Sequence, residues 1–131
     1  RAEANAALLA DHIASLPNVE TVLYPGRSDH PDHARAKELL GGRFGNMLSF
    51  VAKGGRGEAN RLVQAAPQLA FAPTLGDVGT TVSHAASSSH RGMSAQARAE
   101  LGITEGFFRV SVGIEDIELL KSDFSQALAA I

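Results

Sequence analysis

Residues 107 to 116 read F-F-R-V-S-V-G-I-E-D, an apolar stretch interrupted by one arginine. Side chains alternate between the two faces of a β-strand, so every second residue from Phe108 faces one side and Arg109 faces the other. The stretch therefore predicts a strand over residues 107–113, with an apolar face against a core and Arg109 on the opposite face. A guanidinium fixed there can bind a carboxylate through two parallel hydrogen bonds, although an arginine between polar neighbours is more often simply solvated.

The rest of the chain alternates between helical and extended patterns. Apolar residues spaced three and four apart and ended by proline or glycine indicate helices, whereas short β-branched or apolar runs between turn residues indicate strands. The expected helices cover residues 4–16, 31–40, 58–66, 93–101 and 117–128, and the expected strands cover residues 19–24, 47–53, 69–72, 80–86 and 107–113. We therefore expect an α+β fold in which helices pack on one sheet as a two-layer sandwich.

Length and charge narrow the range of partners. With 131 residues and a formal net charge of −2, the chain has the size of one globular domain and no charge excess that favours nucleic acid or a membrane surface. It has no cysteine, which excludes disulfides, thiolate metal sites and a cysteine nucleophile. No apolar run approaches the roughly 20 residues that span a bilayer, and no signal-peptide pattern follows Arg1. We expect a cytoplasmic protein that binds small molecules or other proteins, and the start without methionine suggests a fragment or a processed chain.

Histidines and serines offer two further kinds of site. His30 and His33 are three residues apart, and His84 and His90 flank a run of serines. Zinc needs three or four ligands, so a histidine pair without cysteine more often caps a helix or lies on the surface. The serine run lacks the G-x-S-x-G pattern of a nucleophile, and no glycine-rich loop precedes a helix in the form that binds phosphate. We expect neither a metal site nor a catalytic residue in this chain.

The segment Thr74-Leu75-Gly76 has a local interpretation as a turn after Pro73. In such a turn Gly76 takes a backbone angle that other residues disfavour, and Asp77 accepts a hydrogen bond from a nearby backbone N–H. On local grounds alone this interpretation is the preferred one.

Several short motifs follow one another along the chain. They are Y-P-G at 24–26, H-P at 30–31 with His33, G-N-M-L-S-F at 45–50, K-G-G at 53–55, T-L-G-D-V at 74–78, S-H-A-A-S-S-S-H at 83–90 and F-F-R-V-S-V-G-I-E-D at 107–116. Each is weak alone, but chance does not readily produce so many in one order. Over nearly its whole length the chain resembles the C-terminal domain of the Cys/Met-metabolism family of pyridoxal-phosphate (PLP) enzymes. This family includes methionine γ-lyase, cystathionine γ-lyase and synthase, and O-acetylhomoserine sulfhydrylase.

The resemblance implies a fold and a binding role. Residues 1–131 would form the small C-terminal domain of a fold-type I PLP enzyme, with helices on one mostly antiparallel sheet. An arginine on the last strand binds the substrate's α-carboxylate in this family, which implies that role for Arg109. The family commonly has Ser-Leu-Gly at the position of Thr74, Leu75 and Gly76, so the resemblance implies that these residues line the pocket and contact the same carboxylate.

The resemblance also implies a cofactor that this chain does not hold by itself. PLP is carried on a lysine of a large preceding domain, and nothing in residues 1–131 resembles that domain. Lys37, Lys53 and Lys121 lie in no context that resembles the cofactor lysine and are expected on the surface. We therefore expect no cofactor-binding residue here, no activity from this chain alone, and a homo-oligomeric parent enzyme in which the chain joins its large PLP domain.

The chain departs from the family pattern at four positions, and two of these departures bear on the substrate. Asp77 replaces a frequent glycine, and Gly79 stands where cystathionine-processing members often carry glutamate. Asn46 also replaces a frequent glycine, and Ala85 the usual proline, without loss of a known chemical group. The expected reaction is γ-elimination from a sulfur amino acid of the methionine, homocysteine or cystathionine type. The alternatives are γ-replacement and, from another class, a stand-alone binding or assembly module.

Overall fold

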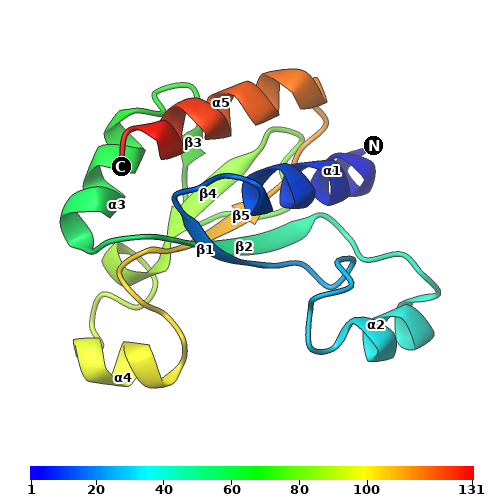
Figure 1. Cartoon of the computed structure of the whole chain (residues 1–131), viewed down its shortest axis with the longest axis horizontal. Coiled ribbons are helices and arrows are strands. Elements are labelled where there is room, and N and C mark those ends of the chain that lie inside the picture. The colour runs from blue at the N-terminus through cyan, green and yellow to red at the C-terminus, as the bar shows by residue number, and fades with distance from the viewer.

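One five-stranded sheet organises the computed structural model, which describes residues 1–131 (Figure 1). Its strand order is β1-β2-β5-β4-β3. The strands are β1 (Val19–Leu23), β2 (Met47–Ala52), β3 (Ala70–Phe71), β4 (Thr81–His84) and β5 (Phe107–Ser111). Neighbouring strands are antiparallel except β3 and β4, which are parallel. The strand that carries Arg109 is thus the central one, between β2 and β4.

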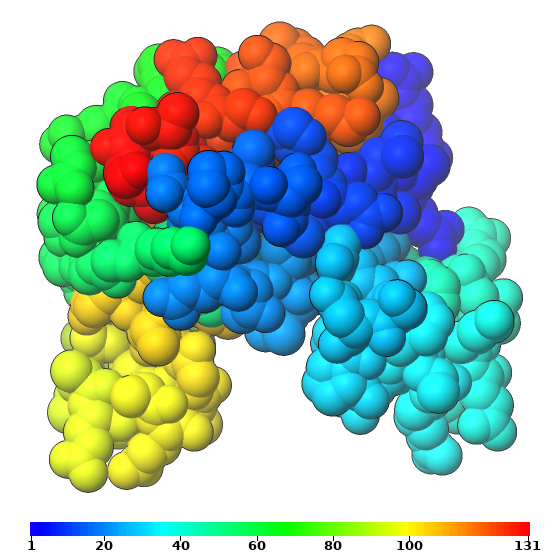
Figure 2. Space-filling view, in the orientation of Figure 1, coloured from blue at the N-terminus to red at the C-terminus, as the bar shows by residue number.

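Three helices cover one face of this sheet (Figure 1). They are α1 (Ala2–Ala14), α3 (Arg56–Gln64) and α5 (Ile117–Ala129). Helices α2 (His33–Leu40) and α4 (Ala95–Glu100) project on the other side, and Figure 2 shows a hollow between the segments that carry them. None of the helices has the length and apolar character needed to cross a bilayer. The sheet therefore has one face covered by helices and one open face.

The core between the sheet and these helices confirms the alternation predicted for β5. Phe108 and Val110 have no exposed surface. The ring of Phe108 stacks on Phe50 of β2 at a centroid separation of 5.3 Å, and Phe50 meets Phe124 of α5 edge to face at 6.1 Å. Because these residues face the helices, Arg109 faces the open side of the sheet.

Every predicted helix and strand is present, and the α+β sandwich with a mostly antiparallel sheet is confirmed. The ends of the elements differ from the prediction. The strand predicted over residues 80–86 ends at His84, where a one-turn 3-10 helix, η1 (Ala85–Ser87), begins. The Ser88 hydroxyl donates to the His84 carbonyl at 2.7 Å, which favours the turn over a continued strand.

Candidate functional site

Arg109 lies half-buried at the centre of the open face. Its cross-strand neighbours are Ser49 on β2 and Ser83 on β4, which the register places on the same face. No other strand residue is a lysine or an arginine. The open face therefore presents one permanent positive charge between two hydroxyl-bearing residues.

The guanidinium of Arg109 is held by backbone carbonyls and has no carboxylate partner. Its Nη2 donates to the carbonyl of Pro73 at 3.2 Å and to that of Thr74 at 3.4 Å. Nε and Nη1 donate to no group of the chain. Five other arginines form ion pairs with carboxylates, namely Arg27, Arg43, Arg56, Arg61 and Arg98. Arg109 thus keeps unused donors of the planar fork that matches a carboxylate.

The segment Thr74-Leu75-Gly76 passes beside Arg109 and forms the predicted turn. Gly76 has a φ of +79°, in the left-handed region, and the Gly79 N–H donates to the Asp77 carboxylate at 3.2 Å. Thr74 reaches Arg109 through its backbone carbonyl, whereas its side chain and that of Leu75 are exposed. The structure thus shows both the turn and its proximity to Arg109. Contact of these three residues with a substrate stays a prediction.

Alternation along residues 107–113 predicts that Ser111 shares the face of Arg109, and the structure confirms it. Sequence reasoning missed three other polar residues around Arg109, namely Ser49, Thr81 and Ser83. These three depend on which strands neighbour β5, and local sequence patterns do not encode that order.

No lysine of the chain lies at this site. Lys53 follows the end of β2 and donates to the Pro17 carbonyl at 2.6 Å. Lys121 pairs with Glu118 at 2.8 Å on α5, in the helical layer behind the sheet, and Lys37 is exposed on α2. PLP is carried by an amine, so the residues present do not form a PLP site by themselves.

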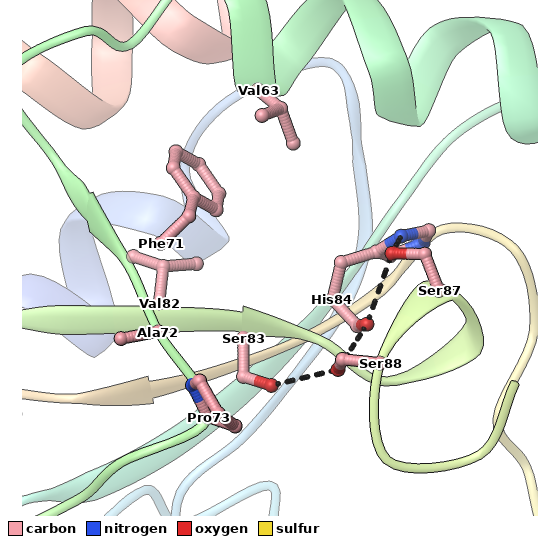
Figure 3. Close-up of a pocket in the computed structure, with 9 residues that line it drawn as sticks. All are labelled: Val63, Phe71, Ala72, Pro73, Val82, Ser83, His84, Ser87 and Ser88. Atoms are coloured by element: carbon pink, nitrogen blue, oxygen red, sulfur yellow. Dashed lines mark hydrogen bonds between the residues drawn. The ribbon is translucent and has the colours of Figure 1, made fainter.

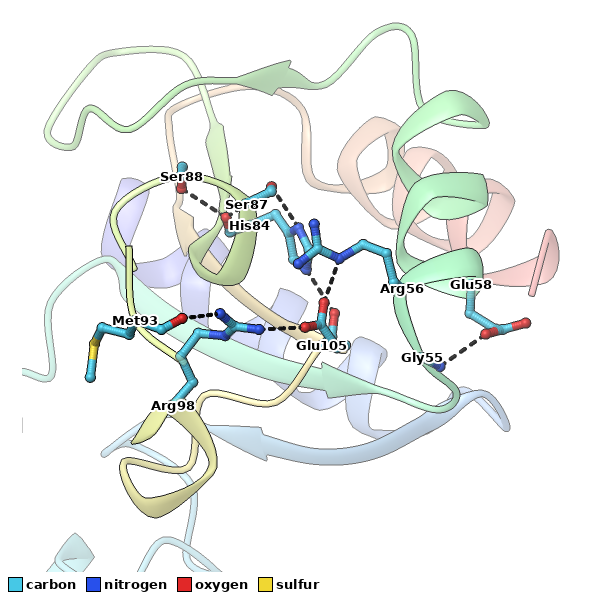
Figure 4. A network of polar contacts seen from close by, with 9 residues as sticks. All are labelled: Gly55, Arg56, Glu58, His84, Ser87, Ser88, Met93, Arg98 and Glu105. Atoms are coloured by element: carbon cyan, nitrogen blue, oxygen red, sulfur yellow. Dashed lines mark hydrogen bonds and ion pairs between the residues drawn. The ribbon is translucent and has the colours of Figure 1, made fainter. Parts of the chain in front are cut away.

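A second polar cluster joins α3, α4 and the end of β4 (Figure 4). The Glu105 carboxylate accepts hydrogen bonds from Arg56 at 2.5 Å and from Arg98 at 2.6 Å. These contacts hold the pKa of the Glu105 carboxyl below its usual value, and the hydrogen bond from Arg56 is the largest cause. His84 Nε2 donates to the Glu105 carbonyl at 2.7 Å, and Nδ1 is 2.8 Å from the Ser87 hydroxyl. Burial is the main cause that lowers the pKa of His84, and the nearby arginines act in the same direction. The cluster therefore holds a neutral histidine that fastens the segment before β5.

Two of the other histidines make contacts close by in the sequence. His33 Nδ1 is 2.8 Å from the Pro25 carbonyl, and His90 Nδ1 is 2.8 Å from the Ser89 hydroxyl. No group of three histidine, cysteine, aspartate or glutamate residues is arranged to hold a metal ion.

The His84 environment predicts an acid-sensitive fold. Because the pKa of His84 is lowered below the ordinary value of 6.5, the unfolded chain binds a proton there that the folded chain does not. The contribution of neutral His84 to stability is complete above pH 6.5, and it is lost as the pH falls below 6.5 toward the lowered pKa of the folded protein. We expect the thermal midpoint of wild type to drop between about pH 7.5 and about pH 5.5, and to drop less in His84→Gln. His90→Gln, at a half-buried position whose side chain bonds to Ser89, serves as the control. An equal drop in all three proteins would exclude His84 as the cause.

A cavity of about 210 Å³ opens beside β4 (Figure 3). Val63, Phe71 and Val82 form an apolar wall, and Ser83 and Ser88 lie on the polar side. The hydroxyls of Ser83 and Ser88 are 3.2 Å apart and bond to one another, so the polar wall is already satisfied within the chain. The cavity borders the Arg109 site without adding a charged group to it.

Comparison with known proteins identifies relatives over nearly the whole chain. The model of the Cys/Met metabolism PLP-dependent enzymes matches residues 1–129. The chain is 40% identical to the O-succinylhomoserine sulfhydrylase of Pseudomonas aeruginosa, over 98% of the chain and 32% of that protein. It is 39% identical to the L-methionine gamma-lyase of Pseudomonas putida, over 97% of the chain and 32% of that protein.

Solved structures share the fold as well. The crystal structure of a cystathionine gamma lyase from Micromonospora echinospora superposes with a TM-score of 0.87 at 38% identity, over 98% of the chain and 33% of that protein. The chain spans about a third of the length of these relatives. The match over residues 1–129 shows that the chain belongs to the family of Cys/Met metabolism PLP-dependent enzymes.

Proposed function

We propose that residues 1–131 form the C-terminal, substrate-carboxylate-binding domain of a PLP-dependent enzyme of sulfur amino-acid metabolism. The observation that carries this proposal is the Arg109 guanidinium, which lies on an open sheet face with Nε and Nη1 unused. The large PLP-binding domain would then lie outside these residues. Family membership supports the proposal, and so does the one-third share of the relatives' length.

A carboxylate is the ligand that this arginine suits best. The planar fork of a guanidinium donates two parallel hydrogen bonds to the two oxygens of a carboxylate. Strands β2 and β4 flank the strand that carries Arg109, so its backbone is already fixed. Binding of a carboxylate therefore costs little conformational entropy. In the proposed enzyme this domain orients the amino acid, and orientation of the reacting groups is its share of the catalysis.

The proposed reaction is γ-elimination, with γ-replacement as the second candidate. The similarity to an L-methionine gamma-lyase favours elimination, and the similarity to an O-succinylhomoserine sulfhydrylase favours replacement. Gly79 stands where cystathionine-processing members often carry glutamate, and the lack of that acidic group supports a smaller sulfur substrate over one with a distal ammonium. Homo-oligomerisation of the parent enzyme is proposed on the family resemblance.

The test is an assay of the full-length protein with PLP. Elimination from L-methionine and water would yield methanethiol, ammonia and 2-oxobutanoate. Replacement would convert O-succinyl-L-homoserine and sulfide into homocysteine and succinate. We expect turnover in one or both assays, and none from residues 1–131 alone because no lysine lies at Arg109. A full-length protein that binds no PLP and turns over no substrate would instead favour the stand-alone binding module.

A further inference from the structure

Ser111 lies on the same face of β5 as Arg109 and is almost fully buried, with 1% of its surface exposed. Its Oγ accepts the backbone N–H of Gly76 at 3.0 Å. Resting on the proposed function, we infer that Ser111 is a positioning residue for the carboxylate site, which it serves by holding the 73–76 segment against Arg109.

The Ser111 hydroxyl is used as an acceptor from two directions. Besides the Gly76 N–H, it is approached by Asn46 Nδ2 at 3.5 Å, and this amide also donates to the Val112 carbonyl at 2.9 Å. A hydroxyl oxygen has two acceptor lone pairs, so these two donors fill them. Asn46, which replaces a frequent family glycine, therefore supplies a contact to Ser111 that glycine lacks.

The 73–76 segment is anchored by three side chains on the open face of the sheet. Ser111 holds the N–H of Gly76, and its cross-strand partner Thr81 donates from Oγ1 to the Thr74 carbonyl at 3.2 Å. Arg109 donates to the carbonyls of Pro73 and Thr74. The Ser111 and Thr81 hydroxyls and the Arg109 guanidinium thus bind the same segment. A shift of the segment would therefore also remove the two carbonyls to which Nη2 of Arg109 donates.

Packing does little to hold this segment in place. Residues 73–76 are exposed, and a Cβ built on Gly76 would meet no atom within 4 Å. Because Gly76 has the left-handed φ of +79°, the turn has many alternatives open to it once its hydrogen bonds are lost. The Ser111 and Thr81 hydroxyls therefore determine the shape of the turn, and through it the direction of the Arg109 fork.

The test uses the full-length protein with PLP and whichever substrate it turns over. We expect Ser111→Ala to raise KM about tenfold, equivalent to about 1.4 kcal/mol, because it leaves the Gly76 N–H without its acceptor. We expect kcat to stay within about twofold of wild type, since the reacting groups lie outside this contact. Thr81→Val should raise KM in the same way, and Thr81→Ser, which keeps the hydroxyl, should restore it.

Two comparisons separate a positioning role from a merely structural one. Ser125→Ala removes a hydroxyl that contacts His12 in the helical layer, and it should leave KM unchanged. The double variant Arg109→Ala/Ser111→Ala should have the KM of Arg109→Ala alone, because both changes act on one binding step. Additive effects, or a lower thermal midpoint in Ser111→Ala without a change in KM, would overturn the inference.

The outcomes also separate this inference from the proposed function. If Arg109→Ala raises KM and Ser111→Ala does not, Arg109 keeps its role and the positioning role of Ser111 is wrong. If Arg109→Ala leaves KM unchanged, the carboxylate site itself is wrong, whatever Ser111→Ala does.

Discussion

Arg109→Ala in the full-length protein is expected to raise KM for the proposed amino-acid substrate by between about 30-fold and about 4,000-fold. Removal of one partner of a desolvated, hydrogen-bonded charge pair costs about 2–5 kcal/mol, and each 1.4 kcal/mol corresponds to a factor of ten. Arg109→Lys keeps the charge but not the planar fork, so it should recover only part of the loss. Steady-state kinetics of both variants measure this.

Arg61→Ala is the matched control for Arg109. Arg61 lies on α3 in the helical layer, is exposed and pairs with Glu58, so its loss changes the net charge equally without touching the open face. Its KM should equal that of wild type. Equal KM changes in the two alanine variants would show that Arg109 acts only through net charge.

Phe108→Ala is expected to lower the free energy of unfolding by about 3–5 kcal/mol. Phe108 is fully buried, and its ring stacks on Phe50 at 5.3 Å and on His84 at 4.7 Å. Truncation to alanine removes both stacking contacts and leaves a cavity in the centre of the sheet. Urea denaturation followed by circular dichroism would measure the loss.

Phe108→Leu is the control for this cavity. Leucine keeps much of the buried apolar area, so the loss should be clearly smaller than with alanine. Equal losses of unfolding free energy in the two variants would mean that the core collapses around either smaller side chain. The cavity would then not be the cause of the destabilisation.

Local patterns predicted most of the fold because they report burial directly. The alternation from Phe107 to Val112 placed Phe108 in the core and Arg109 on the other face, as the structure confirms. The predicted strand at residues 80–86 was too long because the side-chain hydrogen bond from Ser88 to the His84 carbonyl ends it. Such bonds compete with strand pairing, and neither hydrophobicity nor β-propensity reports them.

The contacts between distant segments could not be predicted in the same way. The Gly76–Ser111 and Arg56–Glu105 hydrogen bonds join residues 35 and 49 positions apart, and they exist only because the sheet order brings those segments together. Asn46 shows the same limit, because its departure from the family glycine looked neutral in the sequence and proves to bond to Val112 and Ser111. The family resemblance supplied the proposed role of Arg109, whereas the sheet register determines which residues surround it.

The role of Arg109 is tested most directly by a comparison of a substrate with its carboxamide. Inhibition constants of an unreactive amino-acid analogue and of the corresponding amide would be measured for the full-length wild type and for Arg109→Ala. If Arg109 binds the carboxylate, wild type should prefer the acid by about 100-fold, and the variant should lose most of that preference. The same preference for the acid in both proteins would contradict the role of Arg109.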